Sequence, residues 1–74
     1  MKVTVKLFAS FQVGRFNKEV REYPEQTQII TIIEELKVPV DEVGIILVNS
    51  VHAKPEKCLE DGDVLAIFPT VGGG

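Results

Sequence analysis

Residues 27–39, TQIITIIEELKVP, most restrict the possible folds, because they are the one stretch with helical spacing. The apolar residues recur at intervals of three and four: Ile29, Ile32, Ile33 and Leu36. We expect Thr27 to cap the start of this helix and Pro39 to stop it. Isoleucine has only moderate helix propensity, so packing against another element must hold the apolar face in place.

Strand patterns lie on both sides of this helix. In residues 2–9, KVTVKLFA, Val3, Val5 and Leu7 share one face. Similar signals predict further strands at residues 18–23, 44–49, 51–53 and 64–68. We expect Asn49 and Ser50 to form a turn, and Gly62 in EDGD to adopt the positive φ of another.

This order, two strands, one helix and then further strands, predicts an α+β domain with the helix on one face of a mixed sheet. A right-handed crossover through the helix would place the last strand beside the first, parallel to it and in the middle of the sheet. This is the β-grasp, or ubiquitin-like, plan. We assign it to residues 1–68 and treat residues 69–74 as a tail.

The composition excludes several function classes. A chain of 74 residues makes one domain, and a net charge of -3 offers no basic patch for nucleic acid. Its apolar runs are too short to cross a membrane, and nothing after Met1 resembles a signal peptide. A single cysteine, Cys58, cannot form an internal disulfide. We therefore expect a cytoplasmic protein that is monomeric when free, binds no nucleic acid and contacts no membrane.

The sequence FPTVGGG follows the last strand, and its glycines Gly72, Gly73 and Gly74 form a strip without side chains. Such a strip can enter a channel where any Cβ would clash. We expect Pro69 to end strand pairing and Gly73 and Gly74 to be mobile in the free protein. A terminal carboxyl on Gly74 would be ionised at neutral pH and could act as a nucleophile.

Three segments carry a family resemblance: KLFA, VPVDEVGIILVN and LEDGDVLAIFPTVGGG. Together they resemble the ubiquitin-like sulfur carriers, namely MoaD, the small subunit of molybdopterin synthase, and ThiS, the carrier of the thiamin pathway. The triple glycine is closer to ThiS, and Phe68-Pro69 is closer to MoaD. The chain departs from the family in its short loop SFQVGRFN, in Thr70 where a second proline is common, and in Ser50 where glycine is usual.

The resemblance implies that an E1-like adenylating enzyme uses ATP to activate the Gly74 carboxylate. A sulfur donor, such as a sulfurtransferase, would then convert it to a thiocarboxylate. The sulfur would pass to molybdopterin with the molybdopterin synthase large subunit, or to thiamin thiazole with thiazole synthase. The chain would be a sulfur-carrying co-substrate, not an enzyme, with no bound cofactor. Two alternatives stay open: a protein modifier conjugated through Gly74, and a β-grasp binding module without tail chemistry.

Strand alternation also predicts a partner surface. If Leu65 and Ile67 face the helix, Phe68 faces outward beside Phe8 and Leu47. We expect these three side chains to form an exposed apolar patch at the base of the tail, with Pro69, Val71 and Gly72 also contacting partners. The alternative is that Phe68 belongs to the core.

Other residues have simpler interpretations. His52 is the only histidine and has no suitably spaced partner for a metal, so we expect a surface residue and no metal site. Cys58 could relay sulfur, but a lone cysteine is more often a small packed apolar residue. The acidic pairs and clusters at residues 34–35 and 60–63 are expected to be solvated rather than catalytic. The terminal glycines could also be an expression remnant.

Overall fold

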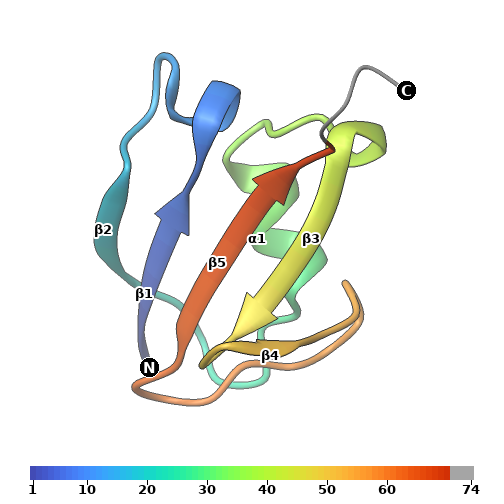
Figure 1. Cartoon of the computed structure of the whole chain (residues 1–74). Coiled ribbons are helices and arrows are strands. Elements are labelled where there is room, and N and C mark those ends of the chain that lie inside the picture. Colours follow the sequence, from blue (N-terminus) through green and yellow to red (C-terminus); the bar gives the residue numbers. More distant parts are fainter. Residues whose placement is uncertain (71–74) are drawn as a thin grey trace.

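The computed structural model describes residues 1–70, and one helix crosses one face of its sheet (Figure 1). The elements in chain order are β1 (Lys2–Leu7), the 3₁₀ turn η1 (Ala9–Gln12), β2 (Lys18–Glu22), α1 (Ile29–Glu35), the 3₁₀ turn η2 (Val40–Glu42), β3 (Val43–Val48), β4 (Val51–His52) and β5 (Val64–Pro69). The strand order is β2-β1-β5-β3-β4, with β5 parallel to β1 and antiparallel to β3. The predicted β-grasp arrangement is confirmed.

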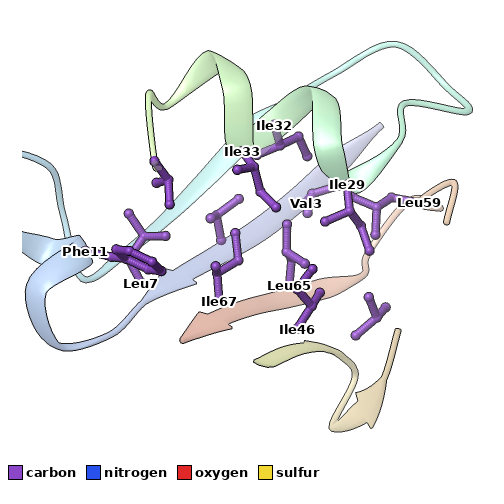
Figure 2. Close-up of a cluster of buried hydrophobic side chains, with 13 residues drawn as sticks. Val3, Leu7, Phe11, Ile29, Ile32, Ile33, Ile46, Leu59, Leu65 and Ile67 are labelled. Carbon is purple, nitrogen blue, oxygen red and sulfur yellow. The ribbon is translucent and has the colours of Figure 1, made fainter. Parts of the chain in front are cut away.

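The core lies between the sheet and α1, and strand alternation determines which side chains enter it (Figure 2). The predicted apolar residues of β1, β5 and α1 face the core and are buried: Val3, Val5, Leu7, Ile29, Ile32, Ile33, Leu65 and Ile67. Leu36, the last of the predicted helix face, is only partly buried. On β3, Ile46 and Val48 are buried as well. Sequence patterns missed Phe11, which is only 2% exposed although it lies in the loop after β1. The turn η1 brings its ring beside Leu7, and burying such a ring contributes about 1.5–3 kcal/mol.

The start of α1 differs from the expectation. Thr27 is not the cap: Gln28 precedes the helix without a side-chain capping bond, and the Thr27 hydroxyl donates to the Pro24 carbonyl at 2.7 Å. The first free N–H groups of the helix instead donate to the loop before β5. Ile29 N donates to Lys57 O at 3.0 Å, and Ile30 N donates to Pro55 O at 2.9 Å. Tertiary contacts therefore replace a local cap.

The end of α1 also differs from the expectation, because Pro39 does not stop it. Lys37 adopts a left-handed conformation with φ of 58°. The N–H groups of Lys37 and Val38 donate back to the carbonyls of Glu34 and Ile33, at 3.0 and 3.1 Å. This is a Schellman motif, which ends the helix before the proline is reached.

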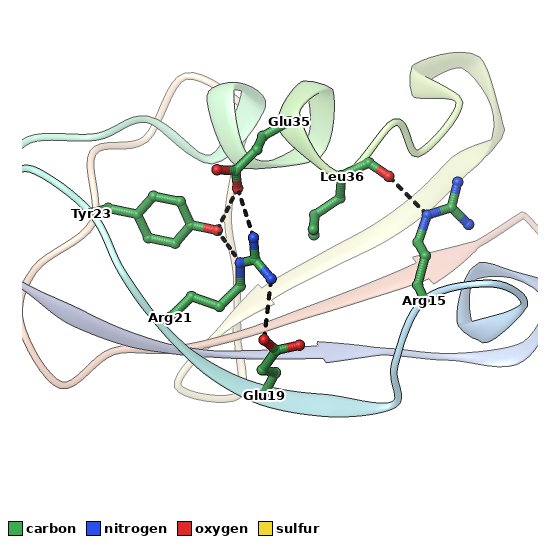
Figure 3. A network of polar contacts seen from close by, with 6 residues as sticks. All are labelled: Arg15, Glu19, Arg21, Tyr23, Glu35 and Leu36. Carbon is green, nitrogen blue, oxygen red and sulfur yellow. Dashed lines mark hydrogen bonds and ion pairs between the residues drawn. The ribbon is translucent and has the colours of Figure 1, made fainter.

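Arg15 completes this helix end from a distant loop (Figure 3). Its Nε donates to Leu36 O at 2.8 Å and its Nη2 donates to Lys37 O at 2.7 Å. A third bond, from Nη1 to Phe11 O at 3.2 Å, ties the same guanidinium to η1. Arg15 thus supplies donors to carbonyls that a helix end leaves without partners, and it joins the η1 loop to α1.

The two tight turns follow the sequence prediction. Asn49 and Ser50 both have positive φ, 51° and 69°, as a two-residue hairpin between β3 and β4 requires. Ser50 adopts a left-handed conformation that glycine accepts at less cost. Gly62 has the expected positive φ, 88°. Within residues 1–70, no helix has the length and apolar character needed to span a membrane.

A cluster of polar side chains joins β2 to α1 (Figure 3). The Tyr23 hydroxyl donates to Glu35 Oε1 at 2.7 Å and accepts a bond from Arg21 Nε at 2.8 Å. Arg21 also forms ion pairs with Glu19 at 3.3 Å and Glu35 at 3.5 Å. Burial, together with the bond to the Glu35 carboxylate, raises the pKa of Tyr23 to about 12.

This pKa predicts a loss of stability in alkali. An unfolded tyrosine loses its proton near pH 10, whereas folded Tyr23 keeps it until about pH 12. The contribution of Tyr23 to the free energy of unfolding is therefore complete below pH 10 and is lost as the pH rises through about 12. Urea unfolding over this range should show the decline, and Tyr23→Phe should show less of it. Because Tyr23 is the only tyrosine, phenolate absorbance reports its titration directly. An ordinary titration near pH 10 in the folded protein would contradict the prediction.

Candidate functional site

The outer face of the sheet, opposite α1, carries two cross-strand rows of side chains. Register places the first row directly across all strands: Lys18, Lys6, Ala66, Leu47 and His52. The second row lies nearer the carboxyl end of β5. Ile45 pairs with Phe68, and Phe8 follows the pair Leu7–Ile67. We call Phe8, Ile45, Leu47, Ala66 and Phe68 the outer-face patch.

Phe8 and Phe68 stack on each other in this patch. Their ring centroids are 4.1 Å apart and their planes differ by 12°. Leu65 and Ile67 are fully buried in the core, so the predicted orientation of β5 is confirmed, and the alternative that Phe68 belongs to the core is wrong. The mutual stacking leaves Phe8 and Phe68 half-buried rather than fully exposed.

An open groove of about 420 Å³ runs over the patch. Its lining combines apolar and polar residues: Lys6, Phe8, Leu47, Asn49, Ser50, Val64, Ala66 and Phe68. The structure therefore brings the three predicted residues Phe8, Leu47 and Phe68 onto one surface. Their role in binding partners stays a prediction.

The end of β5 continues further than expected. Pro69 remains within the strand opposite Val43, and Thr70 N donates to Glu42 O at 2.9 Å. The expectation that Pro69 ends strand pairing is wrong. Successive N–H groups of a strand point to opposite edges of that strand. The N–H of Thr70 points toward β3, so the N–H that Pro69 lacks would have pointed away from β3, and its absence removes no hydrogen bond between β5 and β3. Pairing with β3 thus continues to Thr70.

The described chain ends at Thr70, beside the outer-face patch and the start of β3 (Figure 1). Val71, Gly72, Gly73 and Gly74 lie outside the described residues. The expected mobility of Gly73 and Gly74, and the expected roles of all four residues, therefore stay predictions.

Gly44 positions this end of β5, a function that sequence reasoning missed. A Cβ on Gly44 would lie 2.9 Å from Pro69 O, Thr70 N and Thr70 Cα, all of them backbone atoms. The register between β3 and β5 also shifts at this point, between Val43 and Ile45. A glycine inside a strand is a known signal of a bulge or a close backbone approach, and it could have drawn attention to Gly44.

Gly44→Ala should therefore displace the Pro69–Thr70 backbone and lower the free energy of unfolding by about 1–3 kcal/mol, as other additions of volume to packed sites do. Urea unfolding measures the loss, and the Thr70 amide resonance reports the displacement. The prediction fails if Gly44→Ala matches the unaltered chain in both measurements.

The remaining candidate residues have structural or surface roles. His52 is exposed on β4, as expected, whereas Cys58 is exposed and is not the packed apolar residue that was expected. Within residues 1–70, no three His, Cys, Asp or Glu side chains are grouped to hold a metal.

The acidic residues of the turn before β5 accept hydrogen bonds from nearby groups. Asp61 accepts a bond from Lys2 N at 2.7 Å. Asp63 accepts bonds from Glu60 N at 2.8 Å and Asn49 Nδ2 at 2.9 Å. These carboxylates therefore hold the turn against β1 and the β3–β4 hairpin.

Comparison with known proteins supports a common family. The model of the ThiS family matches residues 5–74. The putative molybdopterin converting factor subunit 1 from Pyrococcus furiosus is 34% identical, with a TM-score of 0.75, and the alignment covers 96% of this chain and 99% of that one. No curated protein sequence matches the chain.

Two more distant structures share the fold. Small archaeal modifier protein 1 from H. volcanii is 20% identical, with a TM-score of 0.76 and coverage of 95% of this chain and 98% of that one. A chain from the complex of subunits 1 and 2 of molybdopterin-converting factor from Helicobacter pylori is 24% identical, with a TM-score of 0.68 and full coverage of both chains. With the family match over residues 5–74, these findings show that the chain belongs to the ThiS family, a family of ubiquitin-like sulfur carriers.

Proposed function

We propose that this protein carries sulfur as a thiocarboxylate on Gly74 and donates it in the biosynthesis of molybdopterin or of thiamin thiazole. The observation that carries the proposal is the position of the outer-face patch. β5 brings the chain to Thr70 beside the Phe8–Phe68 stack, so a partner bound to the patch would receive the segment that leads to Gly74. The family match, which extends to residue 74, supports the same assignment.

The proposed chemistry begins with a carboxylate. A Gly74 oxygen attacks the α-phosphorus of ATP, pyrophosphate leaves, and an acyl-adenylate forms. The outer sulfur of a persulfide on the donor then attacks the acyl carbon and AMP leaves, which gives an acyl disulfide between Gly74 and the donor cysteine. A thiol attacks the donor's sulfur, so that this S–S bond breaks, a disulfide forms on the donor and the thiocarboxylate stays on Gly74. Because carboxylate and phosphate are both anions, the adenylating enzyme must supply the cationic groups that stabilise this step.

The proposal assigns three kinds of partner to the chain. They are an E1-like adenylating enzyme that uses ATP, a sulfurtransferase, and a synthase subunit that accepts the sulfur. The accepting subunit would be the molybdopterin synthase large subunit or thiazole synthase. The Helicobacter pylori structure supports such an assembly, because there a chain with this fold is in complex with subunit 2. In this scheme the chain is consumed and regenerated, and it is not a catalyst.

Intact mass spectrometry tests the proposal. The full chain is incubated with the adenylating enzyme of its own organism, ATP and a sulfur source. We expect a mass gain equal to the exchange of one oxygen for one sulfur, located on the C-terminal peptide. Oxidation of Met1 or Cys58 adds nearly the same mass, so fragmentation and the control Cys58→Ala are needed to assign the gain. Sulfur on Cys58 that persists without Gly74 would overturn the proposed mechanism.

The second candidate function is protein modification through Gly74. It is favoured by the shared fold with small archaeal modifier protein 1 and with Urm1 from Trypanosoma brucei, at TM-scores of 0.76 and 0.71. Both functions begin with the same adenylate, so formation of the adenylate alone does not separate them from each other. Covalent products in which Gly74 is joined to lysines of cell proteins would identify the modifier. Neither reaction would occur in a binding module without tail chemistry.

A further inference from the structure

We propose that the adenylating enzyme covers the outer-face patch and presents carboxylates to Lys6 and Lys18, around an apolar socket for Phe8 and Phe68. This inference rests on the proposed function and adds the charge of the partner surface. Neither the family match nor the neighbouring structures specify that charge.

The two lysines form a directly opposed pair on the outer face. Register pairs Lys6 on β1 with Lys18 on β2, and Val5 and Leu7, which flank Lys6, point into the core. Opposed side chains in an antiparallel pair have Cβ atoms only about 4.5–5.5 Å apart. Neither lysine forms an ion pair with any side chain of residues 1–70. Like charges in this position destabilise a sheet, so the free protein gains nothing from the pair.

Lys6 also belongs to the groove. It lies opposite Ala66 of β5 and lines the groove together with Phe8 and Phe68. The paired positive charges therefore border the apolar surface directly. A partner seated on the Phe8–Phe68 stack would cover Lys6 as well, and it would have to compensate that charge.

The distribution of acidic residues supports an anionic partner. The chain has a net charge of -3, yet three consecutive rows of the outer face contain no acidic residue. These are the two rows described above and the row of Val20, Thr4 and Val64. The acidic residues nearest to these rows are Glu22, which is opposite Lys2, and Asp63, which precedes Val64 and whose carboxylate accepts bonds from Asn49 Nδ2 and Glu60 N. These rows thus carry two lysines and no carboxylate although the protein as a whole is negative, and carboxylates of a partner would be complementary to the lysines.

The test measures association of the full chain with the adenylating enzyme of its own organism at low and high salt. Lys18→Glu places opposite charges across the strands, so the urea midpoint should rise or stay unchanged. The association rate constant should nevertheless fall about tenfold at low salt, with a much smaller effect at high salt. Lys6→Glu should weaken association in the same way. The matched control is Lys57→Glu, an equal change of charge on an exposed lysine of the loop before β5, and it should bind like the unaltered chain.

Binding of Lys6→Glu and Lys18→Glu that equals Lys57→Glu at both salt concentrations would overturn this inference. It would leave the proposed function intact, because the mass gain on Gly74 at saturating adenylating enzyme is a separate measurement. The inference would also be overturned if the unaltered chain bound a labelled single-stranded RNA, or formed dimers in sedimentation, in a manner that Lys18→Glu abolishes. Those results would assign the lysines to nucleic acid or to a second copy.

Discussion

A chain without Gly74 should fold normally and acquire no sulfur. Deletion leaves a carboxylate on Gly73, but this carboxylate is closer to β5 by up to ~3.5 Å of extended chain. Reacting atoms must approach within about 3–3.5 Å, and a 1 Å misplacement can cost about 10²-fold in rate. Intact mass after incubation with adenylating enzyme, ATP and a sulfur source should therefore show no gain.

Stability provides the control for this deletion. Within residues 1–70, every core residue lies between Val3 and Ile67, so we expect that removal of Gly74 leaves this core unchanged. The urea unfolding curve should be the same as for the full chain. Sulfur transfer to the shortened chain at the full rate would show that Gly74 is not the acceptor. A changed unfolding curve would show instead that Gly74 supports the fold.

Phe68→Ala should weaken binding to the adenylating enzyme by about 2 kcal/mol or more, roughly 30-fold, while the fold stays intact. Aromatic side chains at the centre of an interface often contribute this much to binding. Phe68 is only half-buried, and its substitution removes the stack with Phe8, so the stability loss should be about 1 kcal/mol. Isothermal titration and urea unfolding measure the two effects on the same protein.

Ile67→Ala is the matched control for Phe68→Ala. It changes the neighbouring residue of β5, whose side chain is fully buried on the opposite face. We expect it to lower the free energy of unfolding by about 2–5 kcal/mol. Under conditions where Ile67→Ala stays folded, it should bind the enzyme normally. If Phe68→Ala instead loses as much stability as Ile67→Ala and binds normally, the outer-face patch is not the docking surface.

Periodic patterns were sufficient to predict the fold. Val3, Val5 and Leu7 alternate, and Ile29, Ile32 and Ile33 have helical spacing. Such repeats depend only on local geometry, because a strand turns successive side chains to opposite faces and a helix returns to the same face every three or four residues. The same alternation placed Phe8, Leu47 and Phe68 on the outer face before any contact between them was known.

Local signals failed where distant segments decide the outcome. Thr27 has the chemistry of a cap, yet the loop at residues 55–57 accepts the helix N–H groups instead. Pro39 follows a helix that a Schellman motif has already ended. Phe11 lies in a loop but fills a space beside Leu7 that only the assembled sheet and helix create.

Residue patterns alone indicated the succession of strands and helix along the chain, the inner and outer faces, and the family to which the chain belongs. The tertiary structure decided the rest of the candidate site: the stack of Phe8 on Phe68, the seat of Thr70 against Gly44, and the opposed pair Lys6–Lys18. The physical reason is that each of these features joins residues from different strands. The distance between two such residues depends on the register of the strands and on how closely their backbones approach. The periodicity within a single strand specifies neither the register nor this approach.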